Sequence, residues 1–322
     1  MDSKLQNDTV TPLIVITGPT ASGKSALALT LCAQFKGEII NADSALIYRH
    51  LDIGTAKPTP EELKTVPHHL IDILEPEIPF SAGQFCKEAE KTIIDIEQRH
   101  HIPFLVGGTM LYLKTLLYGL STLPTASTEI REAITKDAEK YGWITLHKRL
   151  KQVDPKAAAR IHVNDPQRLQ RALEIYYLTG HAQSDLFETP KQGLIQQSHR
   201  VLTIAVVPKD RAVLHQRIAE RFDAMLEAGF VDEVASLKKR PELHAALPSM
   251  RAVGYRQVWQ YLEGEYDYDT MRNKSIAATR QLAKRQLTWL RRWPEVQCFD
   301  PIEDNFLTTV ENCIRDFLRN SR

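Results

Sequence analysis

Short apolar segments alternate with helical ones over the first 120 residues. Apolar runs of strand length occupy residues 13–17, 37–43 and 101–109, and residues 82–99 have the spacing of a helix. A shorter apolar stretch lies at residues 68–74. Strands that alternate with helices along a chain indicate a parallel sheet with helices on both faces. Ligands bind to such sheets at the carboxyl ends of the strands, so functional residues are expected there.

The pattern changes after this region. Residues 121–198 contain helical segments and no convincing strand, whereas residues 199–208 resume an apolar run and residues 296–300 resemble a late strand. Pro124 and the polar stretch 188–198 are expected at the joints. The predicted domains are residues 1–120 with 199–322, an α/β core that ends in basic helices, and residues 121–198, a helical insertion.

A phosphate-binding motif lies between the first strand and the next helix. Its sequence GPTASGKS fits the pattern G-x-x-x-x-G-K-[ST], in which glycines turn backbone N–H groups onto phosphate oxygens. Lys24 supplies a cation, and Ser25 can hold Mg²⁺. The fold class expected is therefore a P-loop NTPase-like parallel sheet with a helical insertion. The residues of this loop are Gly18, Pro19, Thr20, Ala21, Ser22, Gly23, Lys24 and Ser25.

The sequence matches poorly to the residues that usually accompany a phosphate-transferring P-loop. The strand at 101–109 does not end in an acid that could assist magnesium, and Asp72 lies inside a short apolar run. Guanine-reading elements are absent. The motif leaves open whether the phosphates belong to a nucleotide that donates one or to a substrate that leaves its diphosphate behind.

Two polar residues follow predicted strands, and each has two interpretations. Asp43 could act near the P-loop as a general base or metal partner, or it could cap a helix formed by the ALIYRH stretch that follows. Thr109 could contact a phosphate or a base, or it could cap the helix that begins after it.

A one-sign charged face is predicted near the C-terminus. Residues 271–293 contain seven Lys or Arg and no acid, although the net charge of the chain is only +1. An ordinary solvated helix mixes both signs, so this face suggests a polyanionic partner. Arg272 departs from the face, and apolar residues such as Leu282 and Trp289 fall opposite to it. Its cations are Lys274, Arg280, Lys284, Arg285, Arg291 and Arg292.

Two further segments carry basic residues that could meet an anion. A helix that begins at Pro166, capped by Asn164 or Asp165, has Arg168 and Arg171 near its positive end, which suits an anionic partner or an internal salt bridge. The second segment combines basic, glycine and aromatic residues, which suits backbone contact and stacking on an unpaired base. That segment contains Arg251, Gly254, Tyr255 and Arg256.

The composition, 43% hydrophobic and 25% charged, is that of a globular protein. The polar N-terminus lacks the apolar region of a signal peptide, and no apolar stretch reaches the length of a membrane span. Four cysteines without C-x-x-C spacing and two histidine pairs without a third ligand argue against a zinc site. We therefore expect a cytoplasmic protein without a membrane partner.

Taken together, the motifs resemble the tRNA dimethylallyltransferases, also called tRNA isopentenyltransferases. The resemblance extends from residue 18 to about residue 293, and it is specific through the combination of its stretches. The C-terminus lacks the Cys/His zinc finger of eukaryotic members, so the resemblance is to the bacterial type. The matching stretches are GPTASGKS, NADSALIYRHLDIGTAKP, LVGGTMLYLKTLLYGL, DPKAAARIHVNDPQRLQRALE, MRAVGYRQ and ATRQLAKRQLTWLR.

The resemblance implies that the P-loop holds the diphosphate of dimethylallyl diphosphate together with Mg²⁺ on Ser25. The acceptor would be N6 of adenosine 37, beside the tRNA anticodon, with Asp43 as the general base and Thr109 near donor and adenine. In the family, the core and the insertion hold the anticodon stem-loop from two sides. The positions implied to bind tRNA are Asp43, Ser44, Ala45, Leu46, Thr109, Arg131, Pro166, Gln167, Arg168, Leu169, Gln170, Arg171, Arg251, Ala252, Val253, Gly254, Tyr255, Arg256, Lys284, Arg285, Gln286, Leu287, Thr288, Trp289, Leu290 and Arg291.

Two other functions fit parts of the pattern. A P-loop small-molecule kinase would share the fold and the loop, but the basic helix disfavours it. A nucleotide-switched RNA-binding module would explain the basic faces, but it leaves Asp43 and Thr109 without a role. Within the family, a prenyltransferase of free nucleotides is disfavoured by the RNA-facing segments. We expect a monomer that acts on tRNA.

Overall fold

A computed structural model describes residues 10–119, 123–124, 126–186, 195 and 198–319. Within them, no helix is both long enough and apolar enough to cross a membrane. The chain divides into two compact units, Met1–Leu117 with Ile195–Arg322 and Tyr118–Leu194. The second joint expected from the sequence, at 188–198, lies mostly outside the described residues, as does the polar N-terminus.

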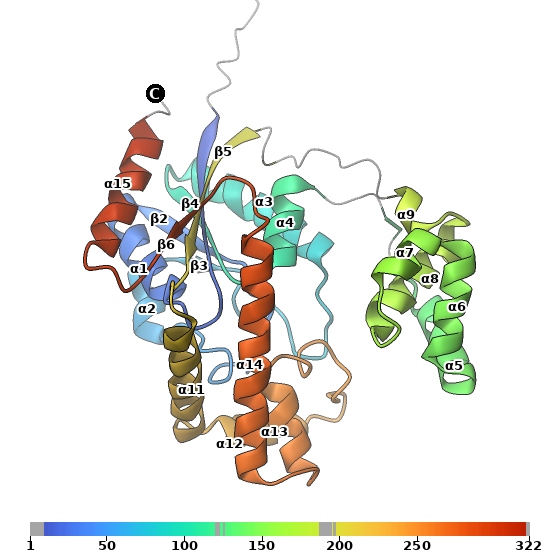
Figure 1. The fold of residues 1–322 in the computed structure, drawn as a ribbon. Coiled ribbons are helices and arrows are strands. Elements are labelled where there is room, and N and C mark those ends of the chain that lie inside the picture. The colour runs from blue at the N-terminus through green and yellow to red at the C-terminus, as the bar shows by residue number, and fades with distance from the viewer. Residues whose placement is uncertain (1–9, 120–122, 125, 187–194, 196–197, 320–322) are drawn as a thin grey trace, which may run out of the picture. The chain divides into compact units, whose positions relative to one another are not determined.

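The larger unit is built on a six-stranded sheet whose strand order is β3-β2-β4-β1-β5-β6, with parallel pairing between all named neighbours (Figure 1). This confirms the predicted α/β fold class. Leu13 to Ile16 in the central strand are fully buried, as expected for a strand covered on both faces. The strands are β1 (Thr11–Thr17), β2 (Gly37–Asn41), β3 (His68–His69), β4 (Ile102–Val106), β5 (His199–Val206) and β6 (Val296–Phe299).

Helices cover both faces of this sheet. On one face, α1 and α15 pack against the strands through side chains that include Leu31 and Ile314. Helix α3 contacts β2 and β4, and its Phe85 ring stacks on Tyr112 of α4, 4.4 Å between ring centroids. The apolar stretch at 68–74 forms only the two-residue strand β3. The helices are α1 (Lys24–Phe35), α2 (Pro60–Thr65), α3 (Ala82–Gln98), α4 (Met110–Tyr118) and α15 (Phe306–Arg319).

A second layer of helices in the same unit lies beyond the carboxyl ends of the strands (Figure 1). Its core contains Phe222, Phe230, Tyr255 and Met271, and the segment after β2 adds Tyr48 to it. This layer places helices opposite the P-loop. Its helices are α11 (Arg211–Glu227), α12 (Phe230–Lys238), α13 (Tyr255–Leu262) and α14 (Tyr268–Leu290).

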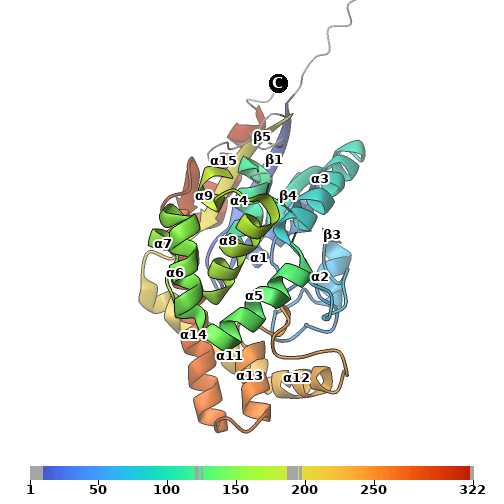
Figure 2. The ribbon, with the colours of Figure 1, turned by 90° about the vertical axis from the view of Figure 1, so that its right-hand side faces the viewer.

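The smaller unit is entirely helical in its described residues. Helices α5, α6 and α8 pack on one another around a core that includes Leu146, Leu150 and Leu173 (Figure 2). Asp165 caps α8, with Pro166 at its first position and Gly180 at its end. The helices are α5 (Thr128–Tyr141), α6 (Trp143–Val153), α7 (Pro155–Arg160), α8 (Pro166–Thr179) and α9 (Gln183–Leu186).

Candidate functional site

The P-loop connects β1 to α1 as the sequence predicts. Gly18 has φ 151°, and a Cβ there would lie 2.4 Å from the carbonyl oxygen of Val206, so only glycine fits. Gly23, with φ 94°, occupies the N-cap of α1 in the left-handed region. Lys24 and Ser25 therefore begin the helix, where backbone N–H groups and the helix dipole favour an anion.

Three ionisable groups set the electrostatics beside this loop. Burial lowers the pKa of Lys24 to about 8, and the nearby Arg221 guanidinium also lowers this pKa. The Asp43 carboxylate has the opposite effect and raises it. Burial also lowers the pKa of Arg221, again against Asp43. Two cations thus interact with one carboxylate, so the charge of the three groups is positive on balance and favours a further anion.

A cavity of about 460 Å³ opens in front of the P-loop. We call it the P-loop lobe. Gly23, Lys24 and Ser25 line it from one side, and Arg217 and Arg221 line it from α11. Backbone N–H groups at a helix start, with three cations around them, form a site for a polyphosphate.

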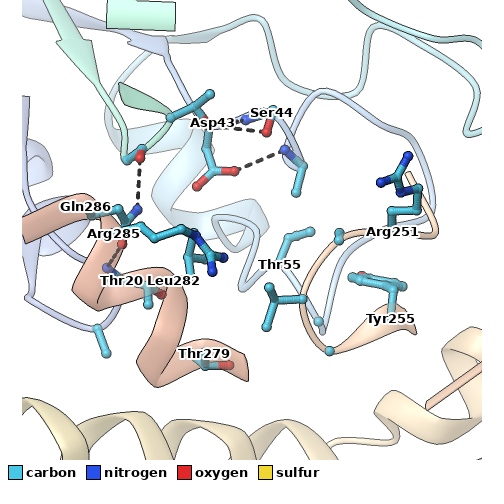
Figure 3. A pocket seen from close by; sticks show the side chains of 18 of the residues that line it. Thr20, Asp43, Ser44, Thr55, Arg251, Tyr255, Thr279, Leu282, Arg285 and Gln286 are labelled. Carbon is cyan, nitrogen blue, oxygen red and sulfur yellow. Dashed lines mark hydrogen bonds between the residues drawn. The ribbon is translucent and has the colours of Figure 1, made fainter. Parts of the chain in front are cut away.

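A second cavity, of about 470 Å³, lies toward α14 and is shown in Figure 3. We call it the α14 lobe. Its wall combines aromatic residues such as Tyr48 and Phe222 with the exposed Arg251 and Arg285. The volume falls in the range of small-molecule sites, roughly 300–1,000 Å³. The residues that line both lobes, and so mark where the lobes meet, are Thr20, Ala21, Asp43, Thr55 and Arg221.

Asp43 is fixed at this junction by its own backbone. Its Oδ1 accepts a hydrogen bond from the N–H of Ala45 (3.0 Å), and its N–H donates to Oδ1 of Asn41 (2.9 Å). The predicted helix after Asp43 is absent, because residues 44–47 form turns. The capping interpretation is therefore wrong for a helix. Asp43 closes a turn and lines both lobes, and Figure 3 shows its carboxylate in the α14 lobe.

Thr109 joins the ends of two strands. Its Oγ1 accepts a hydrogen bond from the N–H of Ser44 (2.9 Å) and donates to the Ser44 hydroxyl (3.2 Å). The Thr109 carbonyl also accepts from Tyr112 N–H at the start of α4, as the capping interpretation expects, and the contact with a phosphate or a base stays a prediction. The two hydroxyls lie beside Asp43 in the wall of the α14 lobe.

Gln286 joins α14 to the P-loop. Its Oε1 accepts from the N–H of Thr20 (2.9 Å), and its Nε2 donates to the carbonyl of Gly108 (2.8 Å) (Figure 3). The side chain is buried. Gln286 therefore positions two loops of its own chain, a role that the sequence alone did not indicate.

The basic face of α14 is exposed, as its periodicity predicts. Lys274, Arg280, Lys284 and Arg285 are all exposed in the helix. Arg272, which departs from the face, makes two hydrogen bonds of 2.6 Å to Asp223. Arg291 and Arg292 are exposed after the helix ends at Leu290. Leu282 and Trp289, predicted opposite the face, line the α14 lobe.

The segment 251–256 differs from the expectation. Arg251 and Arg256 are exposed, but Tyr255 is 0% exposed, packs edge-on against Phe230, and donates its hydroxyl hydrogen to Glu233. The prediction that Tyr255 stacks on an unpaired base is therefore wrong for this conformation. Trp289, 36% exposed at the α14 lobe, is the aromatic side chain that is accessible there.

In the helical unit, two of the predicted RNA-facing arginines are held by a buried acid. Arg131 makes two hydrogen bonds to Glu174 (2.9 and 3.2 Å), and Arg171 makes a third (2.7 Å). Internal salt bridges are therefore present for both arginines of α8: Arg171 pairs with the buried Glu174, whereas Arg168 pairs with Asp165 (3.5 Å) and its side chain remains largely exposed. Leu169 is buried in this unit, as Leu290 is in the larger one, so neither side chain is available to RNA.

Sequence reasoning missed the arginines of α11. Arg217 and Arg221 lie four residues apart, on one face of the helix, and both line the P-loop lobe. Their spacing is visible in the sequence, but nothing there shows which surface α11 faces. Among the described residues, no group of three or more His, Cys, Asp or Glu could hold a metal ion.

The comparisons with known proteins agree with one another. The sequence model of the IPP transferase family matches residues 46–293. A tRNA dimethylallyltransferase of Burkholderia cenocepacia is 54% identical over 295 residues, which cover 90% of this chain and 91% of that protein. A tRNA isopentenylpyrophosphate transferase of Bacillus halodurans is similar in structure, with 36% identity, a TM-score of 0.71 and coverage of 96% and 97%. A eukaryotic dimethylallyltransferase acting on tRNA gives 28% identity, a TM-score of 0.78 and coverage of 96% and 80%.

Proposed function

The chain belongs to the IPP transferase family, and from this premise we propose that it transfers a dimethylallyl group from dimethylallyl diphosphate to N6 of adenosine 37 in tRNA. The observation that carries the proposal is the two-lobed cavity, because it joins a phosphate cradle to a second chamber with Asp43 at the junction. A donor in the P-loop lobe and a base in the α14 lobe would meet at this carboxylate.

The donor half of the reaction depends on charge. The C–O bond between the allylic carbon and the diphosphate breaks, and the leaving diphosphate keeps the electron pair. Lys24, Arg217 and Arg221 stabilise that negative charge, together with the N–H groups at the start of α1. No phosphoryl group is transferred, which is consistent with the weak signal for phosphate-transfer residues around this P-loop.

The acceptor half depends on position and proton removal. The N6 nitrogen attacks the allylic carbon, a C–N bond forms, and the proton that N6 loses passes to the Asp43 carboxylate. Asp43 is held by Asn41 and Ala45, so it is oriented before substrate arrives. We propose that Thr109 and Ser44 contact the adenine beside it.

We propose that Mg²⁺ accompanies the diphosphate. Ser25 is exposed at the start of α1 and lines the P-loop lobe, so its hydroxyl fits as a protein ligand. Mg²⁺ prefers oxygen ligands and often takes most of them from substrate phosphates and water, so Ser25 would supply one ligand and the diphosphate and water most of the others. When bound, the ion neutralises charge on the leaving group.

The tRNA partner is inferred from the family and from the exposed cations of α14. Adenosine 37 must leave its stack to reach Asp43. Lys284, Arg285 and Arg291 suit the backbone of the anticodon stem-loop, and Arg168 suggests a further contact from the helical unit. One chain lines both lobes, so we propose a monomer, and its tRNA substrate suggests the cytoplasm.

The test is an incubation of the purified protein with Mg²⁺, tRNA that lacks the modification, and dimethylallyl diphosphate labelled in its allyl group. We expect label in the tRNA, with diphosphate released in equal amount. Label on free adenosine monophosphate but not on tRNA would indicate a nucleotide prenyltransferase. Phosphate transfer from ATP to a small molecule, without allyl transfer, would indicate a kinase and contradict the proposal.

A further inference from the structure

Glu233, near the start of α12, receives hydrogen bonds from four donors. Its Oε2 accepts from the N–H groups of Asp52 (3.1 Å) and Ile53 (2.6 Å). Its Oε1 accepts from the N–H of Gly54 (3.3 Å) and from the hydroxyl of Tyr255 (2.5 Å). Three successive backbone N–H groups turned toward one carboxylate form an anion-binding concavity. Glu233 therefore holds a loop that lies about 180 residues earlier in the chain.

This loop fits its surroundings tightly. A Cβ on Gly54 would come within 2.1 Å of the Phe230 ring and 2.7 Å of the Tyr255 ring. The Thr55 hydroxyl donates to the carbonyl of Leu51 (2.6 Å), which closes the loop on itself. A shift of the Asp52–Gly54 backbone would therefore move Thr55 with it.

Thr55 connects the loop to the junction of the two lobes (Figure 3). Its carbonyl accepts a hydrogen bond from Nη2 of Arg221 (3.2 Å). Arg221 lines both lobes and interacts electrostatically with Asp43. The contacts thus run without a break from Glu233 through the loop to the guanidinium of Arg221.

We propose that Glu233 is a positioning residue for the transfer reaction, because it fixes the Thr55 carbonyl that orients Arg221 toward the leaving diphosphate. This inference rests on the proposed function and extends it to a residue that contacts neither substrate. The carboxylate is required because each of its oxygens takes two donors. A glutamine would present an amide NH₂ to one of the two pairs, so that pair would lose its acceptor.

The test compares E233Q with D232N, which removes the neighbouring, exposed acid from the same first helical turn. We expect E233Q to lower kcat/KM for dimethylallyl diphosphate about tenfold to a hundredfold, since small displacements of a catalytic group have effects of this order. The dissociation constant for tRNA should change less than about twofold, and D232N should behave as wild type. Normal donor kinetics in a folded E233Q protein would overturn the proposal.

A double-mutant cycle with R221A separates positioning from general stability. If Glu233 acts through Arg221, E233Q should have no further effect on kcat/KM in the R221A protein, although its effect on the melting temperature should persist. If the double variant instead shows the product of the two single-variant losses in kcat/KM, the two residues act independently and the proposal is overturned. If E233Q does not fold, Y255F replaces it in the cycle. Y255F should lower kcat/KM less than is expected for E233Q, and this loss must also vanish in the R221A protein.

The binding of inorganic diphosphate, followed by calorimetry, keeps this inference separate from the proposed function. It requires no transfer and no tRNA. Weaker diphosphate binding by E233Q than by D232N supports the positioning role even in a protein that transfers no allyl group. If the wild-type protein transfers the allyl group but E233Q and D232N bind diphosphate equally well, the positioning role of Glu233 is contradicted and the proposed function is not.

Discussion

The side-chain oxygen of Gln286 lies 2.9 Å from the backbone nitrogen of Thr20, although 266 positions separate the two residues. Through this bond, the helix that carries the exposed basic face holds the loop that cradles phosphate. The N–H of Thr20 already has an acceptor, so it is not available to a phosphate. The buried Gln286 side chain thus connects the helix proposed to bind RNA with the loop proposed to bind the donor.

Replacement of Gln286 by alanine should destabilise the protein. It leaves the N–H of Thr20 and the carbonyl of Gly108 without their present partner, at a cost of about 1–3 kcal/mol for each group that stays dry. Urea unfolding of Q286A should show this loss, and Q281A, at an exposed position of the same helix, should not. Equal stability of the two variants would mean that water replaces the amide at no cost.

The pKa of Lys24 predicts how donor use depends on pH. Burial lowers this pKa to about 8, so the ammonium group is charged below pH 8 and loses its proton as the pH rises through this value. The pH dependence of kcat/KM for dimethylallyl diphosphate reports ionisations of the free enzyme, so kcat/KM should fall as the pH rises from 7 to 9. The K24R variant keeps its charge and should show no such fall. A wild-type profile that stays level from pH 7 to 9 would contradict the role of Lys24.

The three basic groups on and after α14 provide a prediction about salt. Neutralising Arg280, Lys284 and Arg291 together should weaken the binding of every tRNA alike. The slope of log affinity against log salt should decrease by about 0.7–0.9 for each phosphate that the variant no longer neutralises. The choice of adenosine should survive, because phosphate contacts position the RNA without reading its bases. The measurement is a salt titration of anticodon stem-loop binding.

The control for this titration is a second variant with the same change in charge, which replaces the exposed Lys64, Lys87 and Lys91. These residues lie on α2 and α3, away from the basic face of α14. If both variants keep the wild-type slope and affinity, the basic face is only a solvated surface. An equal decrease of the slope in both would indicate an effect of net charge alone.

Glu38 predicts a difference in acid stability at the amino ends of the strands. Burial raises its pKa, but hydrogen bonds from Arg99, His69 and His101 outweigh this and lower it to about 2. A lowered carboxylate pKa stabilises the fold above the usual value of 4.5, and this stabilisation is lost as pH falls toward 2. E38Q should therefore be less stable than wild type near pH 6, and the difference should shrink below pH 4.5. A difference that is constant from pH 6 to 3 would contradict this.

The sheet and the phosphate loop could be predicted because their signals are local. Buried parallel strands appear as apolar runs, and the P-loop appears as glycines, lysine and serine at fixed spacing. The exposed face of α14 could be predicted for the same reason, since a helix repeats its faces at a known angle.

The remaining parts of the site depend on contacts between distant segments. The basic and glycine residues around Tyr255 in the sequence suit base stacking. In the structure, however, the absence of side chains at Gly54 and Gly254 lets Phe230 pack against Tyr255, and the Tyr255 ring lies in the core. Arg221 reaches the site only because α11 lies opposite the P-loop. Neither fact has a local signal. A single sequence contains these contacts but does not show which segments meet.

Asp43 at the junction of the two lobes is the central claim, and its substitution by asparagine tests it most directly. Asparagine keeps an oxygen that can accept from Ala45, so the turn survives while the base is lost. The measurement is mass-spectrometric analysis of nucleosides released from an anticodon stem-loop after incubation with dimethylallyl diphosphate and Mg²⁺. D267N serves as the control, because Asp267 caps α14 outside the two lobes.

We expect the wild-type protein and D267N to convert adenosine 37 to its N6-dimethylallyl form. D43N should do so about 10²–10⁴-fold more slowly, while it binds the stem-loop with an affinity within a few-fold of wild type. Conversion by D43N at the wild-type rate would contradict the account, because Asp43 would then serve only to close the turn after β2.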